Sequence, residues 1–185
     1  MKIIFLGAQG SGKSTQAKML AEELNLPYIE MGQLLRDKSK EDDEEASQIR
    51  QALETGNLVK DEITEDILKQ RLEREDSKNG FILDGYPRNK KQLDTMTEEI
   101  DKVFYVNVSD PESVARLMLR GRADDSEELI KRRLDLYHSE TEPLLEHFKN
   151  EGILEEINGE QTIEQVHEEL KGKITNTKKN ETENN

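Results

Sequence analysis

Apolar residues gather in five short runs, which are separated by longer segments with helical spacing. The runs are residues 3–6, 28–29, 81–83, 103–108 and 153–157, and they are rich in Ile, Val, Phe and Tyr, as strands are. Strands that alternate with helices predict a doubly wound parallel sheet with helices on both faces, an α/β/α arrangement of three layers. Ligands of such a sheet bind beyond the C-terminal ends of its strands.

Between these runs, apolar residues recur every three or four positions, as they do on one face of a helix. Three such stripes lie in residues 17–24, 63–72 and 114–118. A longer stripe runs through residues 129–137, and Pro143 should kink or divide that helix because proline lacks a backbone N–H. The whole pattern therefore predicts an α/β chain built on a five-stranded parallel sheet.

Two segments break the alternation. Residues 30–59 carry two helical patterns and no strand, so we expect a helical insertion over the sheet edge. Residues 171–185 contain one large apolar residue and should form a disordered polar tail. The remaining chain, residues 1–170, is expected to form a single domain, in keeping with a total length of 185 residues.

Composition excludes several classes of partner. The formal net charge is −14, which argues against binding to nucleic acid or to anionic membranes. The chain has no cysteine, so neither a disulfide framework nor a cysteine-based zinc site is expected. No apolar run has the length of a signal-peptide core or a membrane span, and we therefore expect a cytoplasmic protein.

Residues 7–14 read Gly-Ala-Gln-Gly-Ser-Gly-Lys-Ser, the G-x-x-x-x-G-K-S pattern of a phosphate-binding loop, between the first predicted strand and a predicted helix. Glycines let backbone N–H groups turn toward an anion, and the helix N-terminus adds positive potential. Lys13 should then reach the β- and γ-phosphates, and Ser14 should bind Mg²⁺. The alternative interpretation is a glycine-rich turn without a ligand.

A second group of polar residues, 84–88, follows the third predicted strand and reads Asp-Gly-Tyr-Pro-Arg. A carboxylate such as Asp84, beside a phosphate-binding loop, can hold the waters of a bound Mg²⁺. The glycine and the proline favour a tight turn that aims Arg88, whose planar guanidinium can grip phosphate through two hydrogen bonds. An ordinary Asp-Gly-x-Pro turn is the alternative.

Positive charge is concentrated in one stretch, since five of the ten arginines lie within residues 116–133. A solvated helix face could explain such a run. With a phosphate-binding loop upstream, we expect these arginines to bind anions. They are Arg116, Arg120, Arg122, Arg132 and Arg133.

Over residues 1–170 the chain resembles the nucleoside monophosphate kinases, and most closely the adenylate kinase family. The resemblance rests on residues 7–16, 32–36, 56–59, 79–88 with Gln92, 116–122 and 130–133. It implies an enzyme that transfers a phosphoryl group from ATP to AMP with Mg²⁺ and yields two ADP. A monomer is the simplest expectation for its oligomeric state. A kinase of UMP and CMP is one alternative, and a weakly catalytic nucleotide sensor is another.

The resemblance also implies roles for individual residues. The ATP site would contain Gly10, Ser11, Gly12, Lys13, Ser14, Thr15, Arg116, Arg120 and Gln161. The AMP site would contain Met31, Arg36, Asn57, Leu58, Val59, Gly85, Tyr86, Pro87, Arg88, Gln92, Arg122 and Arg133. Catalysis would depend on Lys13, Asp84, Arg88, Arg120, Arg122 and Arg133. Ser14 and Asp84 would bind Mg²⁺ through ATP and waters, and no zinc site is implied.

Gln92 carries a chemical argument for the choice of base. Its amide can accept a hydrogen bond from the 6-amino group of adenine and donate one to N1, whereas guanine presents the opposite pattern. Cytosine offers an edge similar to that of adenine on a smaller ring, and pyrimidine kinases resembling this chain tend to have asparagine at this position. AMP is therefore the expected acceptor.

The chain departs from the family pattern at two places. Met31 and Gln33 stand where the family usually has a threonine and an aspartate. Only Gly121 separates Arg120 from Arg122, so the lid, residues 120–125, is expected to be very short.

Overall fold

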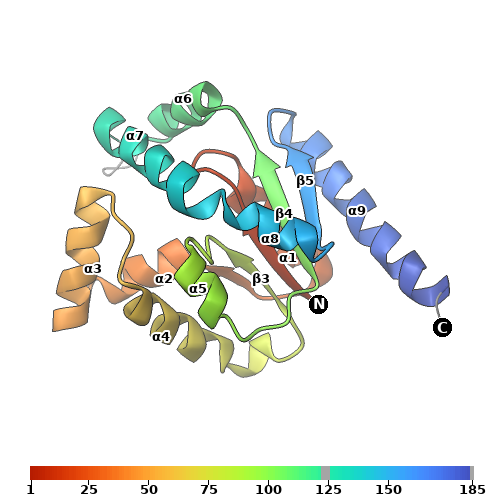
Figure 1. The fold of residues 1–185 in the computed structure, drawn as a ribbon, viewed down its shortest axis with the longest axis horizontal. Helices are drawn as coiled ribbons and strands as arrows, with labels where there is room; N and C mark the ends of the chain where they lie inside the picture. The colour runs from red at the N-terminus through yellow and green to blue at the C-terminus, as the bar shows by residue number, and fades with distance from the viewer. Residues whose placement is uncertain (122–125, 184–185) are drawn as a thin grey trace.

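A computed structural model describes residues 1–121 and 126–183 of the chain, with side chains described as far as residue 174. Five strands form one sheet in the order β2-β3-β1-β4-β5, and every neighbouring pair is parallel, as the apolar runs predicted (Figure 1). The strands are β1 (Lys2–Leu6), β2 (Tyr28–Glu30), β3 (Phe81–Asp84), β4 (Lys102–Asn107) and β5 (Leu154–Asn158).

Helices connect the strands, and those over residues 13–24, 61–72, 110–120 and 127–136 overlap the four predicted apolar stripes. They are α1 (Lys13–Leu24), α2 (Met31–Lys38), α3 (Glu44–Thr55), α4 (Asp61–Leu72), α5 (Lys90–Thr95), α6 (Asp110–Arg120), α7 (Glu127–Leu136), α8 (Leu144–Asn150) and α9 (Ile163–Glu183), with a short 3-10 turn η1 (Glu75–Ser77) and a π-helical turn η2 (Tyr137–Thr141). In the part of the chain that the structure describes, no helix combines the length and apolar character of a membrane span.

Alternating side chains of the central strand enter two separate cores. Ile3 and Phe5 pack against α1 and α9, whereas Ile4 and Leu6 pack in the cluster that contains α2, α4 and α8. All four are at most 2% exposed. Because successive residues of a strand point to opposite faces, β1 needs apolar residues at every position to be covered on both sides. The three-layer prediction is therefore confirmed.

The expected long helix through residues 129–137 is divided before Pro143, as that proline predicted. Helix α7 starts behind Ser126, whose side chain accepts a hydrogen bond from the N–H of Leu129. It ends at η2, where the N–H of Glu142 donates to the carbonyl of Tyr137 at 2.9 Å. Pro143 then directly precedes α8. At this position a backbone N–H would have no acceptor within the helix, so proline is tolerated.

The disordered polar tail from residue 171 stays a prediction; the backbone of α9 is helical as far as Glu183, and its described side chains end at residue 174. Ile174 is 6% exposed and extends the apolar stripe of Val166 and Leu170 by one more turn. Lys173 also donates to Glu155 at 2.9 Å. A single isoleucine at the right helical spacing is enough to dock this one turn of α9.

His138 ties η2 to the start of α6. Its Nε2 lies 2.9 Å from Oδ1 of Asp110, and its Nδ1 lies 2.8 Å from Oε2 of Glu142. Hydrogen bonds to Glu142 and Asp110 raise the pKa of His138. Stability gained from such a pair is fully present below the unfolded-state pKa, about 6.5, and is lost as pH rises through the folded-state pKa.

Replacing His138 by glutamine should therefore lower Tm near pH ~6 and leave it almost unchanged near pH ~9. The side chain is 40% exposed, so the effect should stay below about 1 kcal/mol. Thermal unfolding across this pH range measures it. In an Asp110→Asn, Glu142→Gln background the same substitution should have no pH-dependent effect, and a persisting one would contradict the assignment.

Candidate active site

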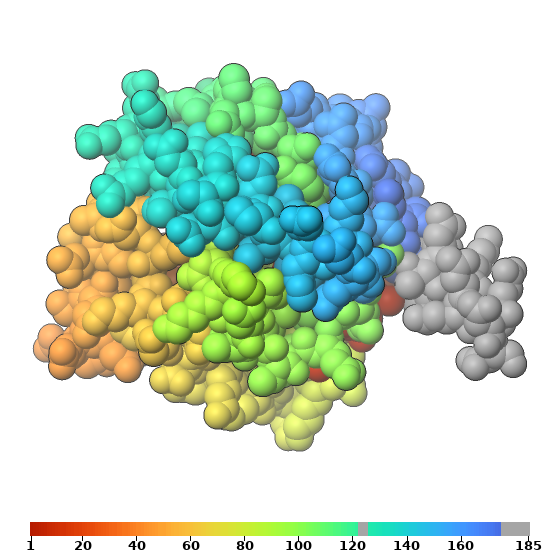
Figure 2. Space-filling model, in the orientation of Figure 1, coloured from red at the N-terminus to blue at the C-terminus, as the bar shows by residue number. Residues whose placement is uncertain are grey.

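A cleft of about 410 Å³ opens beyond the C-terminal ends of β1 and β3, where ligands of this sheet type are expected. The phosphate-binding loop and the end of β3 form its floor. Residues of α2 and of the segment after α3 line one side, and residues of α6 and α7 line the other. The two sides meet through Asn57, whose Oδ1 accepts from Nη2 of Arg132 at 2.6 Å. Figure 2 shows the orange and teal segments adjoining in one continuous surface.

The loop that precedes α1 has the backbone of an anion site. Gly10 has φ +86°, and a Cβ there would lie 2.6 Å from the carbonyl oxygen of Ser113, so only glycine fits. Gly12 caps α1 with φ +89° and offers no side-chain partner for the first helical N–H groups. The N–H of Lys13 makes only a long hydrogen bond, 3.4 Å, to Oγ of Ser11, so this helix N-terminus can still bind an anion in the cleft.

Lys13 and Ser14 follow at the first turn of α1. Nζ of Lys13 donates to the carbonyl of Ala8 at 3.3 Å, within the cleft. Burial is the main cause that lowers the pKa of Lys13, and the charge of Asp84 opposes it. Within residues 1–121 and 126–174 this long hydrogen bond is the one that Nζ donates, so the partly buried ammonium is well suited to donate to a phosphate oxygen.

Asp84 lies at the C-terminal end of β3, with its two oxygens in different situations. Its Oδ2 accepts from Oγ of Ser14 at 2.5 Å and from the hydroxyl of Tyr28 at 2.8 Å. Its Oδ1 is buried and has no hydrogen-bond partner among the described residues. An orphaned carboxylate oxygen beside a serine hydroxyl fits the predicted role of holding the waters of a magnesium ion, because such waters are strong donors.

Two arginines line the cleft from α2 and from the turn after β3, and they are Arg36 and Arg88. Nη2 of Arg36 donates to Oε1 of Glu30 at 2.6 Å and to Oε1 of Gln33 at 3.0 Å. Burial raises the pKa of Glu30, but the hydrogen bond and charge of Arg36 outweigh it, so this pKa lies below its usual value. Gln33 departs from the family pattern. Its side chain helps to hold Arg36, which is predicted to bind the AMP phosphate.

Arg88 is fixed by the turn that contains it. Its Nε donates to the carbonyl of Gly85 at 2.8 Å, and its own carbonyl accepts from Oγ1 of Thr141 at 2.7 Å. Burial is the main cause that lowers its pKa, and the nearby cations Arg133 and Arg36 add to it. Neighbouring cations repel one another, and a bound polyanion would reduce this electrostatic repulsion.

The arginines of α6 and α7 divide between the cleft and its rim. Arg116, Arg120 and Arg133 line the cleft. Arg116 donates to Oε1 of Glu112 at 2.6 Å and to the carbonyl of Ser11 at 3.3 Å. Arg132 turns instead to Asn57, and Arg122 lies outside the described residues.

Most of the predicted site residues that the structure describes line the cleft, whereas six do not. Those in the lining are Gly10, Gly12, Lys13, Ser14, Thr15, Asn57, Leu58, Asp84, Gly85 and Pro87, together with the five arginines Arg36, Arg88, Arg116, Arg120 and Arg133. Those outside it are Ser11, Met31, Val59, Tyr86, Gln92 and Gln161. Met31 and Val59 belong to the apolar core, and Nε2 of Gln161 donates to Glu169 at 3.0 Å.

Sequence reasoning missed Tyr28 and Glu30 as site residues. Burial and the neighbouring Asp84 raise the pKa of Tyr28, which keeps its hydroxyl a donor to that carboxylate. The signal was weak because both residues belong to the three-residue strand β2. No group of three or more histidine, aspartate or glutamate side chains that could hold a metal by itself occurs within residues 1–121 and 126–183.

The chain is similar in sequence to known adenylate kinases. A family model described as Adenylate kinase matches residues 5–153. Adenylate kinase 1 of Nostoc sp. is 41% identical over 156 residues, which cover 80% of this chain and 85% of that protein. Adenylate kinase of Mycobacterium sp. is 40% identical over 156 residues (80% and 86%), and that of Mycobacteroides abscessus is 42% identical over 157 residues (81% and 87%).

Proposed function

The chain belongs to the adenylate kinase family, so its reaction is phosphoryl transfer from ATP to AMP, giving two ADP, and we propose that the cleft above performs it. One observation carries the proposal. The N-terminus of α1, with Lys13, faces a cleft that five arginines also line. Such a concentration of donors in a chain of net charge −14 matches the polyphosphate of two nucleotides held end to end.

The phosphate-binding loop would hold the donor, ATP. Backbone N–H groups around Gly10 and Gly12 would cradle its phosphates, and Lys13 would reach the β- and γ-phosphates. Arg116 and Arg120 would contact the nucleotide from α6. Gln161, near the ATP base in related kinases, has its side chain turned to Glu169 here, so it would act through its backbone.

Mg²⁺ would enter with ATP and be held by Ser14 and, through waters, by Asp84. The orphaned Oδ1 of Asp84 supports this assignment. When bound, the ion would neutralise charge on the phosphates during transfer. Tyr28 donates to the other oxygen of Asp84 and would keep the carboxylate oriented.

The acceptor, AMP, would bind under the insertion of residues 30–59, with its phosphate on Arg36 and Arg88. Phosphoryl transfer passes through a loose transition state that needs positioned charge more than covalent chemistry. Lys13, Arg88, Arg120, Arg122 and Arg133 would supply that charge, and no dedicated general base is required. A weakly catalytic sensor would not need this complete set.

A panel of acceptors tests the substrate. With ATP·Mg, ADP formation should be fastest with AMP, slower with dAMP and CMP, and slowest with UMP and GMP. A coupled assay measures each kcat/KM. Preference for CMP or UMP would instead assign a pyrimidine kinase, and absence of turnover with every acceptor would favour the sensor. Monomeric state and cytoplasmic location stay predictions, as does the short lid, of which residues 122–125 lie outside the described residues.

Replacing Gln92 by asparagine should weaken the discrimination between AMP and CMP by about 1–3 kcal/mol, because the shorter side chain leaves buried polar edges unpaired. The ratio of kcat/KM for the two acceptors measures it. An unchanged ratio would mean that another residue determines which base is accepted.

A further inference from the structure

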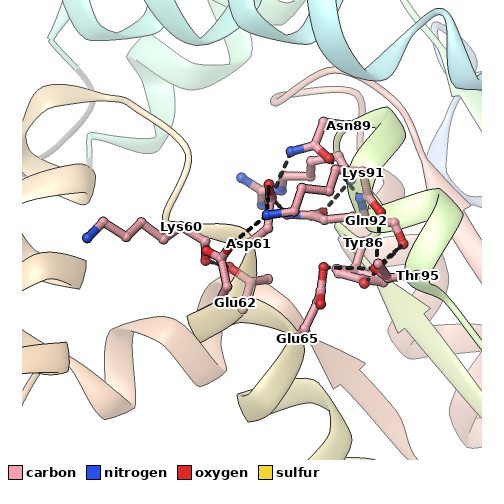
Figure 3. A network of polar contacts seen from close by, with 11 residues as sticks. Lys60, Asp61, Glu62, Glu65, Tyr86, Asn89, Lys91, Gln92 and Thr95 are labelled. Atoms are coloured by element: carbon pink, nitrogen blue, oxygen red, sulfur yellow. Dashed lines mark hydrogen bonds and ion pairs between the residues drawn. The ribbon is translucent and has the colours of Figure 1, made fainter.

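The side-chain amide of Gln92 lies inside a polar network between α4 and α5 (Figure 3). The residue is only 2% exposed. Its Oε1 accepts from the backbone N–H of Arg88 at 2.8 Å, and its Nε2 donates to Oδ1 of Asp61, also at 2.8 Å. Each end of the amide therefore has one protein partner already.

The chemistry of those two partners determines which way the amide points. A backbone N–H can only donate, and a carboxylate can only accept. A flipped amide would set its NH₂ group against the N–H of Arg88 and its oxygen against Asp61. Buried polar groups left without partners are costly, so the observed orientation is strongly preferred.

Asp61 is itself held in place from several directions. Nδ2 of Asn89 donates to the same Oδ1 at 2.8 Å, and Nζ of Lys91 lies 3.8 Å from Oδ2. Asp61 is also the first residue of α4, where the helix N-terminus favours a carboxylate. Asn89 in turn caps α5 by accepting from the N–H of Gln92 at 2.9 Å. The carboxylate of Asp61 and the side-chain amide of Gln92 therefore belong to one hydrogen-bonded unit.

We propose that Asp61 is a positioning residue that sets the amide orientation of Gln92 and thereby favours adenine over guanine as the acceptor base. The inference rests on the role proposed above for Gln92. The amide retains one N–H and one oxygen lone pair for a ligand. In the observed orientation they suit the N1 acceptor and the 6-amino donor of adenine, whereas the flipped amide would suit the N1–H and 6-oxo groups of guanine.

The test compares two acid-to-amide substitutions one turn apart on α4. In Asp61→Asn, the new side chain can donate as well as accept, so one of the two restraints on the flip is lost. In Glu65→Gln, the control, the residue replaced accepts from Oγ1 of Thr95 at 2.8 Å and makes no hydrogen bond to the side chain of Gln92.

Asp61→Asn should reduce the AMP-to-GMP ratio of kcat/KM about tenfold, the effect of one hydrogen bond. The change should appear as a raised KM for AMP and a gain with GMP, with KM for ATP unchanged. Glu65→Gln should leave the ratio as it is. An unchanged ratio in folded Asp61→Asn overturns the inference.

A double variant, Gln92→Met with Asp61→Asn, tests this inference separately from the role of Gln92. Gln92→Met should remove discrimination by itself, and adding Asp61→Asn should then change the ratio no further. A further loss in the double variant overturns the inference, because Asp61 would be acting by another route. If Gln92→Met left the ratio unchanged, the proposed role of Gln92 would fall together with the inference.

A measurement on the unaltered chain covers the case in which Asp61→Asn does not fold. The side-chain amide protons of Gln92, assigned by their absence in Gln92→Met, should show one proton protected from exchange with solvent by its bond to Asp61. Two equally fast-exchanging protons would overturn the inference.

Discussion

Replacing Arg88 by methionine should lower kcat by roughly 10²-fold or more, in line with the removal of other single electrostatic donors. The guanidinium lines the cleft, and the carbonyl of Gly85 fixes its Nε at 2.8 Å. Methionine keeps the apolar stem and removes the charge. Because burial and neighbouring cations already lower the pKa of Arg88, losing this charge should not destabilise the fold. Steady-state kinetics and circular dichroism measure the two effects.

Arg74→Met is the matched control for that experiment. Arg74 is exposed beyond the end of α4 and does not line the cleft. Its replacement should leave kcat within about twofold, as surface substitutions usually do. Near-normal turnover of a folded Arg88→Met enzyme would contradict the role proposed for this arginine.

Asp84→Asn should lower kcat by roughly 10²-fold, a typical loss for one electrostatic group, and raise the Mg²⁺ concentration needed for half-maximal activity. One buried oxygen of the carboxylate has no hydrogen-bond partner in the described part of the chain, which costs stability in the absence of ligands. The amide carries no charge, so Tm should stay the same or rise. Magnesium titrations of the activity and thermal unfolding together test this opposition between activity and stability.

Asp94→Asn provides the matched acid-to-amide control, since Asp94 forms only an exposed pair with Lys90 on α5. Its Mg²⁺ dependence should equal that of the unaltered chain. If Asp84→Asn kept the normal Mg²⁺ dependence as well, the metal role of Asp84 would be wrong, and its orphaned oxygen would need another explanation.

The sequence by itself determined the elements of the fold and the core of the site. Five apolar runs became five parallel strands, because period and composition are local properties of each segment. The residues of the phosphate-binding loop were equally readable, since glycines and a lysine at fixed spacing directly before a helix need no distant partner. Asp84 and Arg88 were found for the same reason, at the end of a recognisable strand.

Only the tertiary structure decided which distant residues meet those local motifs. Glu30 lines the cleft, and Tyr28 donates to Asp84, because β2 pairs with β3 in a register that sets Glu30 opposite Asp84. Asp61 meets Gln92 because α4 and α5 pack together, although 31 positions separate them in the chain. Such contacts depend on strand order and helix packing, which arise from the burial of all the apolar faces at once, so no single segment encodes them.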